Sequence, residues 1–96
     1  ALQRALPPDA IVVGDGADVQ NWMYGLQRIR RAPGFLEHYP LGSMGIGMPL
    51  AVGAAAAARE LASSGEPRRR VVLVTGDGSF GFYPFELESA RSAGLD

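Results

Sequence analysis

The 96-residue chain contains no cysteine and only one histidine. Without cysteine it can form neither a disulfide nor a thiolate zinc site, and a single histidine excludes a metal held by several histidines. Disulfides are typical of secreted proteins, so their absence favours an intracellular protein and we expect a cytoplasmic location. The hydrophobic content of 47% is that of an ordinary globular chain, and the length suits one small domain or part of a larger one.

The sequence also has no large excess of positive or negative charge, and it has no long hydrophobic run. Its formal net charge is -1, and no basic stripe stands out that would bind a nucleic acid. The longest run of apolar and small residues, Met44–Ala58, covers 15 residues, whereas a helix needs roughly 20 to span a bilayer. We therefore expect neither nucleic acid nor a membrane as a partner.

A short apolar run, Val71–Val74, is followed by the glycine-flanked aspartate of Gly76-Asp77-Gly78 and then by a helical pattern that starts at Pro84. The run predicts a buried strand. Glycines let backbone amides approach an anion, and Asp77 offers a carboxylate oxygen to a divalent cation. The stretch therefore predicts a phosphate and metal site, although the same residues would also form an ordinary tight turn.

A second glycine-flanked aspartate, Gly14-Asp15-Gly16, follows another apolar run near the start of the chain. The patterns predict strands at 11–13 and 71–74, helices at 18–31, 46–63 and 84–93, and an irregular loop at 35–45. The order strand, helix, helix, strand, helix favours an α/β class with parallel strands. Because ligands of such sheets bind beyond the carboxyl ends of the strands, we expect both turns to line one crevice.

Three kinds of site can be weighed for the later turn. Gly76, Gly78 and Gly81 satisfy the dinucleotide fingerprint G-x-G-x-x-G, but the aspartate inside it would face a pyrophosphate unless a cation intervened. A serine hydrolase elbow would require glycine where Asp77 stands. A diphosphate bound through Mg²⁺ makes use of the Asp77 carboxylate. The dinucleotide and Mg²⁺-diphosphate interpretations both stay open on these residues alone.

Two ordered motifs, Gly42–Pro49 (GSMGIGMP) and Gly76–Phe80 (GDGSF), together resemble the cofactor-binding C-terminal domain of thiamine-diphosphate enzymes. The nearest likenesses are acetolactate synthase, benzoylformate decarboxylase, oxalyl-CoA decarboxylase and 2-hydroxyacyl-CoA lyase. The resemblance covers residues 9–96 and leaves residues 1–8 as a linker or the end of a preceding helix. It implies an incomplete three-layer thiamine-diphosphate-binding fold with a parallel sheet, and thiamine diphosphate and Mg²⁺ as cofactors.

The later motif corresponds to the diphosphate end of the cofactor in this resemblance. Asp77 matches the aspartate that ligates Mg²⁺. Gly78 and Ser79 match residues whose backbone contacts the diphosphate, and Gly76 beside them is included in the expected cofactor-binding set. The resemblance therefore implies one metal ligand in this chain, Asp77.

The earlier motif corresponds to the ring end of the cofactor. Gly42 matches the residue whose carbonyl accepts a hydrogen bond from the amino group of the pyrimidine, and Ser43 follows it in the expected cofactor-binding set. Met44 matches the bulky apolar residue wedged between the pyrimidine and thiazolium rings. A methionine suits that position because its side chain is apolar and adaptable.

Two further loops have less specific matches. Ala17 and Asp18 lie where the acyl-CoA lyases carry a Gly-Ala-Asn-type loop that touches the diphosphate, and we include both in the expected set. Asp18 departs from asparagine, and a carboxylate beside a diphosphate is unfavourable, so it can instead be only a helix N-cap. His38 and Tyr39 either line the substrate side or belong to a solvent-exposed loop.

The resemblance also implies parts that this sequence lacks. The family has a second metal ligand, usually asparagine, further along the chain, and a glutamate that activates the aminopyrimidine on a domain usually contributed by a partner subunit. We therefore expect a fragment of a carboligase or decarboxylase that acts on 2-oxo acids or 2-hydroxyacyl thioesters, inactive by itself and without a catalytic residue of its own. At full length we expect a homodimer or homotetramer. A Rossmann-like or other nucleotide-binding module is the alternative.

Overall fold

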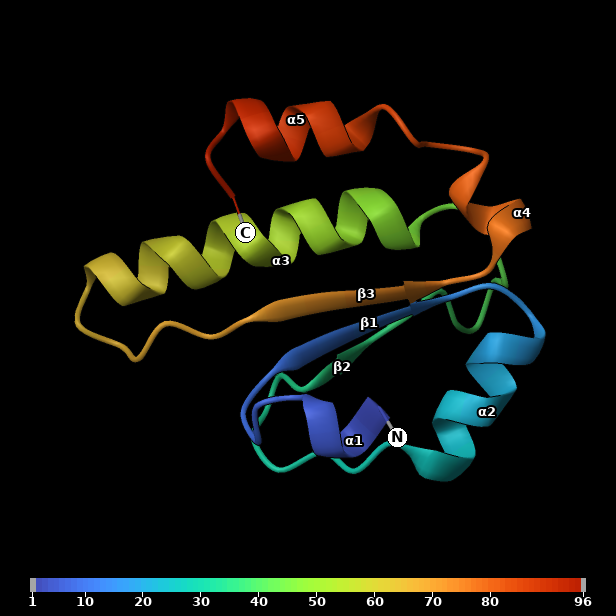
Figure 1. Cartoon of the computed structure of the whole chain (residues 1–96), viewed down its shortest axis with the longest axis horizontal. Coiled ribbons are helices and arrows are strands. Elements are labelled where there is room, and N and C mark those ends of the chain that lie inside the picture. Colours follow the sequence, from blue (N-terminus) through green and yellow to red (C-terminus); the bar gives the residue numbers. More distant parts are fainter. Residues whose placement is uncertain (1, 96) are drawn as a thin grey trace.

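The computed structural model describes residues 2–95. The elements in chain order are α1 (Leu2–Ala5), β1 (Ile11–Asp15), α2 (Asp18–Leu26), β2 (Phe35–Leu36), α3 (Gly47–Ser63), β3 (Val71–Thr75), α4 (Asp77–Phe80) and α5 (Glu86–Ser92). A three-stranded sheet lies between α3 and α5 on one side and α1 and α2 on the other (Figure 1). The expected α/β class with a parallel sheet is confirmed.

All strand pairs in the sheet are parallel, and the strand order is β2-β1-β3. The register runs from Ile11 opposite Val71 to Asp15 opposite Thr75. β1 is the central strand and is buried along its whole length, because it has a strand at each edge and helices over both faces. This topology places the carboxyl ends of β1 and β3 side by side.

The helix α3 packs against β1 and β3 and holds α5 on its outer side (Figure 1). Its run of alanines allows a close approach to the sheet, and Met48 and Ala58 are among its buried residues. On the opposite face, α2 turns Met23 inward against the sheet. The small side chains of α3 therefore suit close packing on the face of a sheet. No helix among residues 2–95 has the length and hydropathy needed to cross a membrane.

The helix predicted over residues 18–31 is shorter than expected, because α2 ends at Leu26 and Gln27 adopts an extended backbone with ψ 130°. The arginines that follow are exposed, and the side chain of Ile29 is 49% exposed. A further turn would therefore have buried little apolar surface, and helices in proteins depend on such burial. The basic residues at 28–31 consequently do not cap α2.

The loop predicted over residues 35–45 contains the edge strand β2, whose two residues are too few to show a period along the sequence. Pairing with β1 defines it, and just before it the backbone N–H of Val12 donates to the carbonyl of Gly34 at 3.0 Å. The single-turn helix α4 was likewise not predicted. The last predicted helix is confirmed over Glu86–Ser92, within its expected range of 84–93.

Candidate functional site

The two glycine-flanked aspartates meet at the carboxyl edge of the sheet, as expected for parallel strands. The backbone N–H of Gly76, just after β3, donates to the carbonyl of Asp15 at the end of β1, at 3.1 Å. Gly16 has φ +124°, and a Cβ on it would lie 3.3 Å from the Gly76 nitrogen. The turns therefore pack backbone to backbone, and glycine is required at Gly16 both by its φ and by this close approach.

The carboxylate of Asp15 holds a third segment at the same edge. Asp15 is only 1% exposed, and its two oxygens accept the backbone N–H of Gly45 at 3.1 and 3.0 Å, while Oδ2 also accepts the N–H of Gly47 at 2.8 Å. Hydrogen bonds to an ionised acceptor are stronger than neutral ones, and here they also satisfy buried amides. Asp15 therefore joins the motif Gly42–Pro49 to the turn that precedes α4.

The sequence predicted that the turn containing Asp15 lies at the ligand edge, but it assigned no role to the Asp15 side chain. The sequence signal that could have indicated a role is a carboxylate directly at the end of an apolar strand, followed by glycine. A buried carboxylate needs hydrogen-bond donors, so that pattern indicates a nearby loop with free amides. Only the fold shows that the donors are Gly45 and Gly47.

The helix α3 begins against Asp15 so closely that its first residue must be glycine. A Cβ on Gly47 would lie 2.4 Å from the Asp15 Cβ and 2.8 Å from its Oδ2. We therefore expect Gly47→Ala to lower the free energy of unfolding by about 2 kcal/mol, since the clash falls on a buried, backbone-anchored group.

Gly53, in the same helix, is the matched control because a Cβ there would meet nothing within 4 Å. Gly53→Ala should raise the free energy of unfolding by about 0.5–1 kcal/mol through helix propensity alone. Urea unfolding of both variants checks this difference. Equal stability of the two would contradict the close packing of Gly47 on Asp15.

The Gly42–Pro49 motif also contacts the segment that follows α4. Gly45 has φ +94°, and a Cβ on it would lie 2.6 Å from the Cβ of Phe82. The side chain of Met44, next to this contact, is 47% exposed, and Gly42 is exposed with φ +69°. The Gly42–Pro49 and Gly76–Phe80 motifs are thus brought to one edge, with Met44 accessible there.

Asp77 is the first residue of α4 and is exposed. Among residues 2–95, its carboxylate has no hydrogen-bond or ion-pair partner. The helix geometry also leaves the backbone N–H groups of Gly78 and Ser79 without an intrahelical acceptor. An available carboxylate beside unpaired amides can bind a divalent cation and an anion together.

Ser79 differs from its neighbours because it is buried, with 2% exposure. Its hydroxyl oxygen has no hydrogen-bond partner among the described residues. Buried hydroxyl groups are normally satisfied, so this one is an unused donor and acceptor at the ligand edge. The resemblance implies only a backbone contact between Ser79 and a diphosphate; the structure adds the hydroxyl of Ser79 to the polar groups present.

The expectation that Asp18 caps α2 is wrong. The N-cap position is occupied by Ala17, and no side chain caps the helix. Asp18 is instead the first helical residue, where its charge still faces the positive end of the helix. Both Ala17 and Asp18 are exposed and follow Gly16, which touches Gly76, so they lie at the same edge as α4.

The solvent-exposed alternative for His38 is also wrong. His38 is only 9% exposed, and neither ring nitrogen has a hydrogen-bond partner among the described residues. Tyr39, the next residue, is 68% exposed. The loop was predicted to be irregular, and the burial of His38 within it could not be predicted from a pattern without a period.

The metal-binding capacity of the described chain is limited. Among residues 2–95, no group of three or more His, Cys, Asp or Glu side chains is arranged to hold a metal ion. Asp77 therefore offers one protein ligand, and phosphate oxygens, water or other protein groups would have to complete the coordination of a bound cation.

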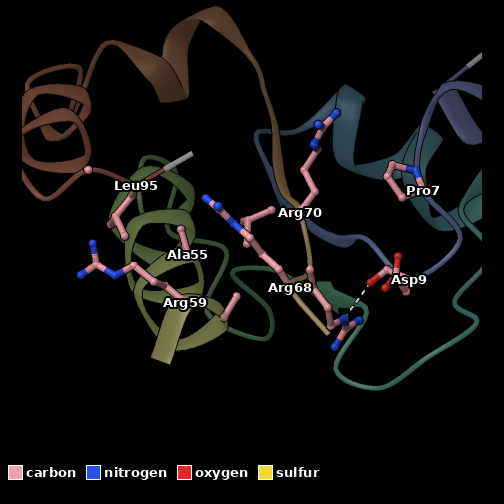
Figure 2. Close-up of a pocket in the computed structure, with 11 residues that line it drawn as sticks. Pro7, Asp9, Ala55, Arg59, Arg68, Arg70 and Leu95 are labelled. Carbon is pink, nitrogen blue, oxygen red and sulfur yellow. Dashed lines mark hydrogen bonds between the residues drawn. The ribbon is translucent and has the colours of Figure 1, made fainter. Parts of the chain in front are cut away.

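A cavity of about 400 Å³ lies at the opposite edge of the sheet, near the starts of β1 and β3. Arginines line much of it, but the side chains of Arg59, Arg68 and Arg70 extend in different directions (Figure 2). Arg69 donates to the carbonyl oxygens of Asp9 and Pro33 at 2.7 and 2.6 Å, which anchors local backbone. The cavity therefore lacks the converging donors of an anion site.

Comparison with known proteins identifies the family. Residues 12–96 match the family described as "Thiamine pyrophosphate enzyme, C-terminal TPP binding domain". The chain belongs to this family. The match includes both the Gly42–Pro49 and the Gly76–Phe80 motif, and the resemblance predicted from these two motifs is confirmed.

Several relatives of this thiamine pyrophosphate-binding domain are much longer proteins. The acetolactate synthase large subunit of Parasynechococcus marenigrum is 39% identical over 93 residues, which is 96% of this chain and 14% of that protein. The 2-hydroxyacyl-CoA lyase 1 of Mus musculus is 31% identical over 88 residues, 92% of this chain and 14% of that protein. Acetolactate synthase isozyme 1 large subunit of Escherichia coli is 31% identical over 96 residues, 100% of this chain and 16% of that protein. The chain thus spans about a seventh of these relatives' length.

Proposed function

We propose that this chain forms the diphosphate- and metal-binding part of a thiamine diphosphate site in a longer enzyme of the acetolactate synthase or 2-hydroxyacyl-CoA lyase type. The observation that carries the proposal is the junction at Asp15. Its carbonyl holds Gly76 and its carboxylate holds Gly45 and Gly47, so the loops before α4 and α3 face the same edge.

At the diphosphate end, Asp77 is the proposed Mg²⁺ ligand. It is exposed and without a partner among the described residues, which is the state a metal ligand needs before binding. The amides of Gly78 and Ser79 would donate to diphosphate oxygens, and Gly76 gives the backbone room to approach. The buried hydroxyl of Ser79 is a further donor close to this position.

At the ring end, Gly42, Ser43 and Met44 are the proposed contacts. The carbonyl of Gly42 would accept a hydrogen bond from the aminopyrimidine, and Met44 would keep the two rings bent toward each other. Partial exposure of Met44 at the ligand edge supports this role. Bound thiamine diphosphate would supply the carbon nucleophile, while these residues only bind and orient it. Ala17 and Asp18 are proposed as a further loop beside the diphosphate.

The rest of the site would come from outside the described residues. The second metal ligand and the activating glutamate are proposed to lie elsewhere in the longer protein, the glutamate on a pyrimidine-binding domain of a partner subunit. A shared site of this kind implies a dimer or tetramer. The proposed substrates are 2-oxo acids or 2-hydroxyacyl thioesters, and residues 9–96 are proposed as the part of the cofactor-binding domain found here.

Calorimetric titration of the full-length protein tests this proposal. In the presence of Mg²⁺, thiamine diphosphate should bind saturably and thiamine at least tenfold more weakly, because thiamine lacks the anion that the metal and the amides of α4 recognise. A nicotinamide dinucleotide serves as the competing ligand. Preferential binding of the dinucleotide would favour the Rossmann-like alternative and reject the proposed cofactor.

A further inference from the structure

A glutamate outside the sequence motifs ties α2 to the loop that leads into Gly42. The Oε2 atom of Glu37 accepts three hydrogen bonds: from Nε2 of Gln20 at 3.2 Å, from the hydroxyl of Tyr24 at 3.0 Å and from the backbone N–H of Tyr39 at 2.6 Å. Two of the donors lie on α2 and the third lies in the loop after β2. Glu37 therefore connects two segments that are separate in the sequence.

The α2 side of this network is itself held in place. Gln20 is 3% exposed, and it lies so close to β1 that a Cβ on Gly14 would be 2.4 Å from its Oε1. Its Nε2 also donates to the hydroxyl of Tyr24 at 3.1 Å. Gln20 thus reaches Glu37 from a fixed, buried position against the sheet.

Aromatic packing adds a second connection at the same place. The ring of Tyr24 packs edge to face against Phe35 of β2, with centroids 6.0 Å apart, and against Tyr39 at 6.3 Å. Such aromatic pairs contribute stabilisation in addition to that from the burial of their apolar surface. Tyr39 is therefore fixed through its backbone by Glu37 and through its ring by Tyr24.

The loop continues from this anchor directly to Gly42. The backbone N–H of Gly42 donates to the carbonyl of His38 at 3.0 Å, which closes a turn over Tyr39. At its other end, Gly45 is held by Asp15. The segment from Gly42 to Met44 consequently spans two fixed points, Glu37 on one side and Asp15 on the other.

We propose that Glu37 is a positioning residue for Gly42 and Met44, and so for the ring end of the bound cofactor. The inference rests on the proposed function, because it assumes that Gly42 and Met44 contact the aminopyrimidine and thiazolium rings. Glu37 touches neither ring in this assignment. It acts through the backbone of Tyr39 and the turn that ends at Gly42.

The test compares two probes in the full-length protein with Mg²⁺ present: thiamine diphosphate, which has rings, and inorganic diphosphate, which has none. Glu37→Ala should weaken thiamine diphosphate binding about tenfold and leave inorganic diphosphate binding unchanged, because the two donors on α2 and the one in the loop lose their shared acceptor while α4 is untouched. Glu37→Gln should retain affinity within about threefold, since a glutamine carbonyl can accept the same hydrogen bonds. Thermal unfolding of each variant checks that the variant is folded.

Glu66→Ala is the matched control. Glu66 forms an exposed ion pair with Arg31 at 2.7 Å, and removal of such a pair should change neither affinity. Equal weakening of both probes by Glu37→Ala, or no weakening of either, overturns the inference. Failure of the unmodified protein to bind thiamine diphosphate overturns the proposed function and this inference with it. If Glu37→Ala does not fold, Tyr24→Phe removes one donor to the same oxygen and should weaken only the ring-bearing probe.

Discussion

Replacement of Asp77 by alanine is expected to abolish the contribution of Mg²⁺ to thiamine diphosphate binding, a loss of roughly a hundredfold or more in affinity. Loss of a residue that merely orients a metal ligand typically costs 10- to 100-fold, so loss of a ligand itself should reach the top of that range. Because Asp77 is exposed and has no partner among residues 2–95, the substitution should leave the folded chain intact. Calorimetric titration with and without Mg²⁺ measures the effect.

Two further variants separate metal binding from general electrostatics. Asp77→Asn retains one neutral oxygen and should lose less affinity than alanine, since carboxylates are the stronger ligands of Mg²⁺. Glu88→Ala removes an exposed carboxylate on α5 and should leave the Mg²⁺ dependence unchanged. Mg²⁺ dependence that persists in Asp77→Ala would show that the metal is held by other groups.

Replacement of Asp15 by alanine is expected to destabilise the protein by about 4 kcal/mol. The substitution leaves the buried N–H groups of Gly45 and Gly47 without acceptors, and each unsatisfied group costs about 1–3 kcal/mol. It also opens space beneath the start of α3. The shift in the urea unfolding midpoint measures the loss, and cofactor affinity should fall with it because the loop before α3 is released.

Asp18 provides a matched control, since it is an aspartate three residues away that is exposed and caps nothing. Asp18→Ala should change the free energy of unfolding by less than about 1 kcal/mol, the size of a charge interaction at a helix end. Asp15→Asn should be intermediate in stability, because its amide group can accept from one of the two backbone amides but not replace both carboxylate oxygens. Equal stability of Asp15→Ala and Asp18→Ala would contradict the role of Asp15 as the junction.

The predictions that the structure and the comparisons confirm rest on local chemistry. A few neighbouring residues are enough to predict each of these features: the apolar runs of β1 and β3, the alanine-rich helix α3 and the glycine motifs. The errors occur where tertiary contacts compete with local pattern. α2 ends early because its continuation would bury little, and β2 exists because β1 is available to pair with it. The hydrogen-bond partners of Asp15 could not be predicted, because they lie 30 and 32 residues away.

The sequence by itself determined the α/β class, the family and the two motifs that meet at the carboxyl edge, since strand patterns and glycine-flanked carboxylates are short-range properties. Only the tertiary structure decided what holds the motifs together. Asp15 and Glu37 accept hydrogen bonds from backbone amides and side chains that are distant in sequence. Hydrogen bonds of this kind produce no periodic pattern in the sequence from which they could be predicted. Their roles depend on which segments the parallel sheet brings within hydrogen-bonding distance.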